Sequence, residues 1–235
     1  MKNSEYASML KSILGLRYEP VAVKLIRRDE PDPVGYSLPD KQMSHCQAVM
    51  SAKAGNSVYL SDAMQGCNVG ASALGLREAG EKVTNGEFHF NFGVHDTQEA
   101  AAEMIASRSE LPQIYKGEII TPLKEADFVP DSVIIVDIPE RFYWFVLLKT
   151  HEKGGRAVFT TAPFQAVCVD CTVYPILNSE INISLGCYGC RRRTDIRQEE
   201  LIVGFPGIRL EEIVTVLKKY NEEGDRPLLS KAKRD

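Results

Sequence analysis

The sequence lacks the features that mark exported, membrane-spanning and nucleic-acid-binding proteins. Residues 1–20 carry several charged side chains and no apolar stretch followed by a small-residue cleavage site, which a signal peptide would need. The longest uninterrupted apolar run covers residues 142–148, far short of the roughly 18 residues that cross a bilayer. A net charge of -4 gives no electrostatic reason to expect general nucleic-acid binding. We therefore expect a cytoplasmic protein with no membrane and no nucleic acid among its partners.

Common motifs of nucleotide and metalloprotease chemistry are also missing. The chain contains no Walker loop, no dinucleotide-binding GxGxxG and no HExxH. Its composition over 235 residues, 44% hydrophobic and 26% charged, is that of a globular protein and excludes disordered, collagen-like and coiled-coil chains. There is no internal repeat and no interdomain linker. We expect a single domain over residues 1–225 and a charged C-terminal tail at 226–235.

Hydrophobic patterning predicts an α/β fold. Residues 132–138 form a continuous apolar run typical of a buried strand, Pro139 then opens a helix to 150, and 156–161 is the next expected strand. This βαβ order predicts a mixed β-sheet covered by helices. The other expected elements are helices at 4–14, 44–54, 66–79, 97–108 and 210–220, strands at 20–26, 58–60, 88–92, 181–185 and 201–205, a loop at 27–39, and a helical or turn segment at 166–177.

Cysteine is the residue that stands out from this ordinary background. In a reducing compartment, cysteines act as metal ligands or redox groups more often than as structural disulfides. The last four follow the pattern C-x2-C-x15-C-x2-C, a spacing within the range of four-thiolate zinc sites. The six cysteines are Cys46, Cys67, Cys168, Cys171, Cys187 and Cys190.

A zinc site built from the last four cysteines would leave Cys46 and Cys67 without a role. Both lie near expected helix starts, where the helix dipole lowers the pKa of a thiol and stabilises anionic ligands. Iron–sulfur clusters are also commonly held by four thiolates, and the net charge of the site does not distinguish the two metals. The residues that follow the two pairs, Thr172 and Arg191, are larger than those typical of zinc knuckles.

The residues next to the cysteines suggest further roles. A run of three arginines that begins with Arg191 could offset the charge of thiolates, tune a reduction potential or receive an anionic substrate. The same run could be a solvated basic turn. His45, beside Cys46, is a candidate ligand or proton donor, or else a histidine hydrogen-bonded locally at a helix start.

Three other interpretations of the cysteines stay open. Some of them can be small buried hydrophobic residues, since free cysteine is among the most buried residue types. Either Cys-x-x-Cys pair could be a thioredoxin-like redox pair, although neither lies between a clear strand and a long helix. A cofactor-free thiol enzyme with Cys46 as nucleophile and His45 as base is disfavoured, because adjacent residues seldom point into one site.

Several sequence blocks resemble an uncharacterised prokaryotic family, the domain-of-unknown-function family one-six-nine, which is frequent in archaea and anaerobic bacteria. The blocks are YEPVAVK at 18–24, CQAVM at 46–50, GCNVGASALG at 66–75, SLGCYGCR at 184–191 and EELIVGFP at 199–206. The similarity spans nearly the whole chain and implies one family domain. It implies no activity, because the family has none established.

The resemblance also implies a different ligand set from the one that spacing suggests. The family pattern places a cysteine at the positions of Cys46, Cys67, Cys168 and Cys187. Cys171 and Cys190 resemble additions found in some members. One ligand from each of four segments is compatible with a cubane cluster held where several loops meet, and an oxygen-sensitive cluster suits anaerobic hosts.

We therefore expect an iron–sulfur protein with one 4Fe-4S cluster, acting in electron transfer or as the redox centre of an enzyme. Cys46, Cys67, Cys168 and Cys187 are its first-choice ligands, with Cys171 and Cys190 as alternates and Arg191 in the surroundings. Its expected partner is a redox protein or a small anionic substrate, and a homo-oligomer stays open. The alternative is a zinc-binding interaction domain in which the last four cysteines hold a structural zinc.

Overall fold

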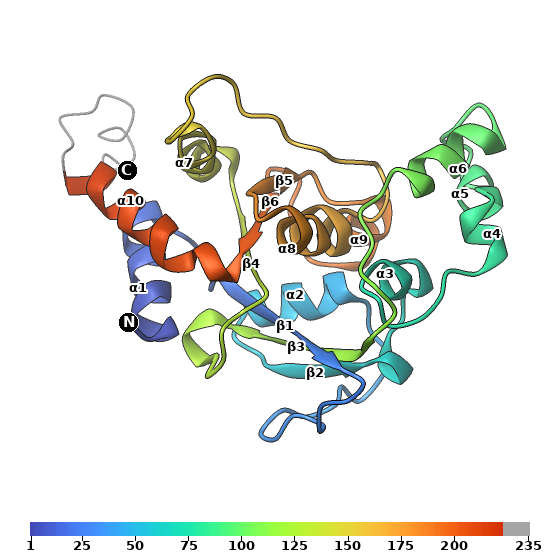
Figure 1. The fold of residues 1–235 in the computed structure, drawn as a ribbon, viewed down its shortest axis with the longest axis horizontal. Helices are drawn as coiled ribbons and strands as arrows, with labels where there is room; N and C mark the ends of the chain where they lie inside the picture. The colour runs from blue at the N-terminus through green and yellow to red at the C-terminus, as the bar shows by residue number, and fades with distance from the viewer. Residues whose placement is uncertain (223–235) are drawn as a thin grey trace.

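The computed structural model describes residues 1–222 and is built around one β-sheet. Its strands are β1 (Val21–Arg27), β2 (Val58–Ser61), β3 (Tyr115–Pro122), β4 (Ser132–Asp137), β5 (Asn182–Ser184) and β6 (Leu201–Pro206). They lie in the order β2-β3-β1-β4-β6-β5 (Figure 1). Each pair of neighbouring strands is antiparallel.

Helices surround this sheet. The α-helices of the described residues are α1 (Asn3–Leu14), α2 (His45–Lys53), α3 (Asn68–Ala73), α4 (Glu81–Thr84), α5 (Glu87–Phe90), α6 (Gln98–Ala106), α7 (Pro139–Thr150), α8 (Tyr174–Asn178), α9 (Tyr188–Arg193) and α10 (Leu210–Glu222). Short 3-10 helices lie at Asp62–Met64, Leu123–Glu125 and Gly207–Arg209, and a π-helix at Ala166–Val173 leads directly into α8.

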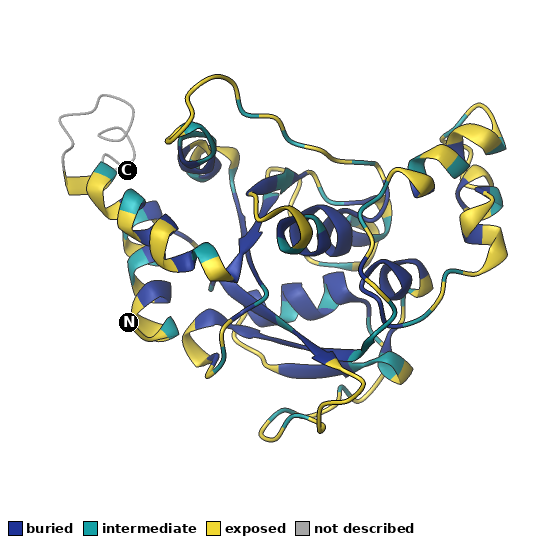
Figure 2. Cartoon of the chain, viewed as in Figure 1, coloured by how far each residue is buried: buried dark blue, intermediate teal, exposed yellow. Residues whose placement is uncertain are grey.

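Side-chain alternation along the strands divides the core between the two faces of the sheet. On β4, Val133 and Ile135 belong to a hydrophobic cluster on one face, whereas Ile134 and Val136 belong to a cluster on the other. Helices α1, α7 and α10 cover the first face, which we call the apolar face. Helix α2, the π-helix and α9 cover the second, which we call the cysteine face. The strands between them are buried (Figure 2).

The π-helix lies directly on the sheet. A Cβ atom added to Gly204 of β6 would come within 2.0 Å of the carbonyl oxygen of Cys171, so only glycine permits this approach. The hydroxyl of Thr172 donates to the carbonyl of Val167 at 2.9 Å inside the widened turn. Turns of this type are rare and occur frequently at functional sites.

A helical insert, residues 81–106, leaves the sheet and carries α4, α5 and α6. The three helices contact one another and project at the right of Figure 1. At Gly86, which has a φ of 81°, an added Cβ atom would lie 2.4 Å from the backbone nitrogen of Ala102. The glycine therefore sets the close packing of α5 against α6.

Most of the expected elements are confirmed. Ser44 caps α2, Thr97 caps α6, and Pro139 occupies the first turn of α7. Strands β1, β2, β4, β5 and β6 and helices α1 and α10 lie where the pattern predicts them. The segment 27–39 is a loop. The helix expected at 66–79 is shorter, because α3 ends at Ala73.

Three expectations are wrong. Residues 156–161 form no strand: the side chain of Asn182 takes the place of a neighbouring strand, since its Oδ1 accepts from the Thr160 N–H at 3.0 Å and its Nδ2 donates to the Thr160 carbonyl at 2.7 Å. Without that strand there is no βαβ unit, and the sheet is antiparallel rather than mixed. Residues 88–92 lie in α5 and the turn after it, not in a strand.

β3 is a separate omission, since no strand was expected where it lies. β3 pairs with both β1 and β2. The expected tail at 226–235 lies outside the described residues. Over residues 1–222, no helix combines the length and the apolar character that a membrane crossing requires.

Candidate functional site

The cysteine face brings sulfur atoms from separate segments together. Cys46 lies in the first turn of α2, and a capping box fixes the start of this helix. In the box, the N–H of Gln47 donates to Ser44 Oγ at 3.3 Å, and the N–H of Ser44 donates to Gln47 Oε1 at 2.9 Å. Cys168 comes from the π-helix and is 4% exposed.

Two more cysteines occupy the position just before a short helix. Cys67 precedes α3, and its Sγ accepts the N–H of Gly70 at 3.5 Å. Cys187 precedes α9, and its Sγ accepts the N–H of Cys190 at 3.3 Å. Gly70, in α3, lies beside two of the sulfurs: a Cβ atom there would lie 3.6 Å from the Cys67 sulfur and 3.5 Å from the Cys168 sulfur. These two sulfurs therefore lie on the same side of α3.

Four of the six cysteines line a single cavity of about 380 Å³. They are Cys46, Cys67, Cys168 and Cys187, one from each of four segments. Aromatic and aliphatic side chains form most of the remaining wall, so the sulfurs face a largely apolar space that opens to the surface. This is the set that the family resemblance implies, and it differs from the set that CxxC spacing suggests.

The Cys187 sulfur has the most hydrogen-bond donors of the four. Backbone N–H groups of Gln165, Ala166 and Cys190 point at it, and the thiol of Cys46 donates to it. Gln165 has a φ of 60°, unusual for a residue with a side chain, and lies immediately before the π-helix. Donation from Cys46 and from these N–H groups outweighs burial and lowers the pKa of Cys187 to about 5.

The thiols of Cys46 and Cys168 resist ionisation. The pKa of Cys46 is raised, first by its hydrogen bonds to Cys187 and Cys190 and then by burial. Burial, followed by the charges of Cys67 and Cys187, also raises the pKa of Cys168. Among Cys46, Cys168 and Cys187, the protein alone therefore favours the thiolate form at Cys187. Several thiolates would need a cation among them.

The two remaining cysteines lie outside the cavity wall. Cys171 is fully buried against the sheet, and its Sγ donates to the carbonyl of Ile202 at 3.7 Å. Cys190 lies within hydrogen-bonding reach of the same Cys46 thiol, and its Sγ is 3.8 Å from Thr194 Oγ1. The Cys-x-x-Cys pairs are therefore split, each with one member on the cavity and one behind it.

The donors are not arranged around a single ion. Across residues 1–222, no group of three or more His, Cys, Asp or Glu side chains is placed to hold one metal ion. A tetrahedral zinc site with Zn–S distances of about 2.3 Å would put its sulfurs about 3.8 Å apart. The described residues include no such arrangement.

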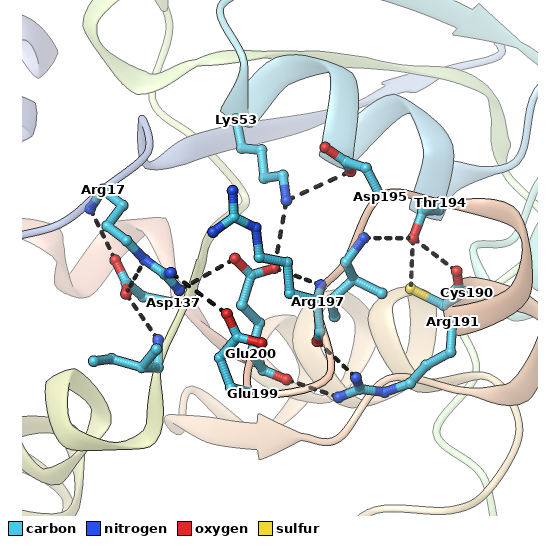
Figure 3. A network of polar contacts seen from close by, with 12 residues as sticks. Arg17, Lys53, Asp137, Cys190, Arg191, Thr194, Asp195, Arg197, Glu199 and Glu200 are labelled. Carbon is cyan, nitrogen blue, oxygen red and sulfur yellow. Dashed lines mark hydrogen bonds and ion pairs between the residues drawn. The ribbon is translucent and has the colours of Figure 1, made fainter.

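A partly buried network of charges ties α2, which carries Cys46, to the segment that follows α9 (Figure 3). Lys53, in the last turn of α2, lies 3.7 Å from Glu200 and 3.5 Å from Asp195, which follows α9. Arg17 joins the same Glu200 carboxylate to Asp137 at the end of β4, with N–O distances of 3.2 and 3.1 Å. Both of these carboxylates are fully buried.

The arginines have unequal roles. The guanidinium of Arg191 donates to the backbone carbonyls of Leu185, Arg197 and Glu200 at 2.7, 2.9 and 2.7 Å. It therefore holds the loops on either side of α9, and this structural task places it outside the cavity wall. Arg193 is the arginine of the run that lines the cavity.

His45 does not face the cavity. Its Nδ1 lies 2.8 Å from Glu118 Oε2 and its Nε2 lies 3.0 Å from the hydroxyl of Thr172. Gln65 Nε2 donates to the other oxygen of Glu118 at 2.9 Å. The histidine is thus hydrogen-bonded as one interpretation held, but to partners far away in the sequence. The geometry does not place it as a base for Cys46.

The aromatic wall of the cavity was missed in the sequence. Its residues are Phe88, His89, Phe92, Phe164 and Tyr188. The first three come from the FHFNF block, whose alternation we interpreted as a strand; three phenylalanines in five residues were the available signal.

The similarity to known proteins covers almost all of the site-bearing chain. The family described as "Uncharacterised ArCR", DUF169, matches residues 9–216, a range that includes all six cysteines. The chain belongs to the DUF169 family. It is 28% identical to "Uncharacterized protein MJ0308" of Methanocaldococcus jannaschii over 220 residues, which cover 93% of this chain and 94% of the relative. No solved structure matches.

The suspected family is therefore confirmed. Membership in DUF169 brings no activity with it, because neither the family's description nor the relative's name states one. The chemistry of this DUF169 chain has to be inferred from its thiol-lined cavity.

Proposed function

We propose that Cys46, Cys67, Cys168 and Cys187 bind an iron–sulfur cluster of the four-iron type, and that the protein acts in electron transfer or as the redox centre of an enzyme. The observation that carries the proposal is the meeting of four cysteines from four separate segments in one cavity. Clusters of this type are commonly held by four thiolates. The cluster would supply one-electron chemistry inside an apolar wall.

The hydrogen bonds to sulfur support the same assignment. N–H groups reach the sulfurs of Cys67 and Cys187, and such bonds are among the factors that set cluster potentials. They favour the thiolate forms that metal binding requires. The raised pKa of Cys46 and of Cys168 implies in addition that cluster binding releases protons.

Four segments that each supply one cysteine are compatible with a cluster, as the family resemblance implies. A cluster is several atoms across and takes its thiolates from points further apart than one zinc ion does. A structural zinc held by Cys168, Cys171, Cys187 and Cys190 stays the alternative from sequence. It would require Cys171 to leave the carbonyl of Ile202 and turn toward the cavity.

The decisive experiment is anaerobic purification followed by iron, sulfide and zinc analysis and a visible absorption spectrum. We expect a brown protein with iron and acid-labile sulfide in equal amounts. A colourless protein with stoichiometric zinc would contradict the proposal. Unfolding of the C-terminal third on chelation would then support the zinc alternative.

Two matched serine variants test the ligand set. Cys67→Ser removes a thiol that lines the cavity, and we expect it to lose most of the iron. Cys171→Ser changes a cysteine outside the cavity wall, and we expect its iron content to match that of the unchanged protein. The opposite pattern, with iron lost only in Cys171→Ser, would refute the assignment of ligands. Circular dichroism of both variants checks that they fold.

A further inference from the structure

The outer part of the cavity is walled by aromatic rings in mutual contact. Ring centroids of Phe92 lie 5.4 Å from Phe88, 5.4 Å from Phe164 and 5.8 Å from Tyr188. Phe88, Phe92 and Tyr188 are each more than 40% exposed. Two elements supply these three rings: the helical insert provides the phenylalanines, and α9 provides the tyrosine. Such a wall presents flat apolar faces suited to another ring.

His89 adds an unused polar atom to the same wall. It lines the cavity, is 2% exposed, and packs on Phe164 with 4.9 Å between ring centroids. Its Nδ1 is buried and has no hydrogen-bond partner within residues 1–222. Buried polar atoms are nearly always paired, and no described residue supplies this pairing. Burial lowers its pKa to about 4, which leaves a neutral imidazole at pH 7.

Arg193 adds a positive charge to the cavity wall. Its side chain has no carboxylate partner in the described part of the chain, whereas Arg191 is held by backbone carbonyls and Arg192 donates to the hydroxyl of Tyr188 at 2.8 Å. A cavity of about 380 Å³ falls within the range of small-molecule sites, which combine an apolar wall with a few fixed polar groups.

We propose that the outer part of this cavity binds a small aromatic carboxylic acid. The ring lies against Phe92 and Tyr188, the carboxylate pairs with Arg193, and His89 forms a hydrogen bond to the ligand. The role of this ligand as a substrate beside the redox centre rests on the proposed function. Binding itself needs only the aromatic wall, His89 and Arg193.

Benzoate is the probe, with benzyl alcohol as a neutral comparison of similar shape. Ligand-observed NMR on the full chain, as purified anaerobically, measures both at millimolar concentration. We expect saturable benzoate binding that Arg193→Gln weakens by about tenfold, because a charge-assisted hydrogen bond is lost. Binding of benzyl alcohol should not change in that variant.

A pair of phenylalanine variants tests the wall. Phe92→Ala removes a ring that lines the cavity, and we expect about fivefold weaker benzoate binding. Phe90→Ala is the control, since Phe90 is 36% exposed on the same insert but does not line the cavity. Equal binding by the two variants, or no saturable binding to the unchanged protein, would overturn the proposal.

The same titration on iron-free protein separates this inference from the proposed function. Saturable binding that depends on Phe92 and Arg193 in a protein that never contains iron would support the ligand site and contradict the cluster. An iron–sulfur spectrum without benzoate binding would do the reverse.

Discussion

The apolar face and the cysteine face share the same strands but differ in what they bury. The apolar face holds large rings in close contact, such as Phe142, Phe145 and Phe205. The cysteine face packs small residues and thiols on the sheet, and it buries polar side chains such as His45 and Glu118. Both faces bury an extensive apolar cluster, but the larger aromatic side chains lie on the apolar face.

This difference between the two faces bears on why the thiol-lined cavity lies on the cysteine face. Buried polar groups stabilise a fold little even when fully paired, and they destabilise it when a partner is lost. A cavity with several titratable thiols adds to that cost. We infer that the close-packed apolar face supplies the stability that allows the other face to be specialised.

The largest expected effect comes from breaking the apolar face. Phe145→Ala removes a fully buried ring that stacks on Phe205 with 5.7 Å between centroids. We expect a loss of about 4 kcal/mol in the free energy of unfolding, because a cavity remains in the core. Urea denaturation measures it. Tyr143→Ala, on the same helix but 41% exposed, should cost far less.

The loss of stability on the apolar face should leave the properties of the cysteine face unchanged in this variant. Folded Phe145→Ala protein should keep the iron content and the thiol reactivity of the unchanged protein. A parallel loss of iron from folded Phe145→Ala protein would mean that the two faces are coupled.

Breaking the polar network of the cysteine face should have the next largest effect. Glu118→Ala leaves His45 Nδ1 and Gln65 Nε2 buried without their acceptor. We expect a loss of about 3 kcal/mol in the free energy of unfolding, since both groups stay desolvated. Glu118→Gln retains one acceptor oxygen and should lose less. Equal stability of Glu118→Ala and the unchanged protein would show that water or rearrangement satisfies the two groups.

The parts of the fold that could be predicted from the sequence are those with local signals, such as helix caps. Ser44, Thr97 and Pro139 mark helix starts through backbone chemistry that acts within a few residues, and these helices are confirmed. Strand pairing depends on distant partners. The strand expected at 156–161 fails because the Asn182 side chain occupies its hydrogen-bonding position, which no local pattern shows.

The site was predictable to a similar degree. Cys46, Cys67, Cys168 and Cys187 could be grouped through the family resemblance, whereas spacing alone paired the wrong cysteines for the cavity. The place of His89 in the cavity wall could not be predicted. Its block alternates apolar and polar residues as a strand does, but it lies in a short helix that a glycine precedes. Its role depends on the packing of the insert against Phe164, a contact across 75 residues.

The pH dependence of stability tests the cysteine face through a single group. Burial raises the pKa of Asp170 from 3.8 to about 7, although Thr161 and Ser184 donate to its Oδ2 at 2.7 and 2.9 Å. Because the folded pKa lies above the unfolded one, the stabilisation is complete below the unfolded pKa and is lost as pH rises through about 7. We expect the free energy of unfolding to fall by a few kcal/mol over this pH range, since each pKa unit between the folded and unfolded states contributes about 1.4 kcal/mol.

Asp170→Asn separates this group from the other titrating residues. The variant cannot ionise, so its unfolding free energy should decline less as pH rises from 3.8 to above 7. Urea denaturation at several pH values compares the two proteins. Identical pH profiles would show that Asp170 has the same pKa in the folded and unfolded chains.

The smallest expected effects come from the two non-glycine residues within 1–222 that have a positive φ. Ser179 has a φ of 53° at the end of α8 and is exposed, and its backbone position is one that glycine prefers. Ser179→Gly should therefore stabilise the protein by about 0.5 kcal/mol. Gln165 has a φ of 60° as well, but its Oε1 accepts from the buried guanidinium of Arg108 at 2.8 Å. Gln165→Gly relieves the same backbone strain and loses this bond, so we expect a net loss of about 1 kcal/mol. Thermal denaturation of both variants measures the contrast. A gain in stability for both would mean that the Gln165 side chain has no structural role beside the cavity, and that its strained backbone is retained for the hydrogen bonds to Cys187 alone.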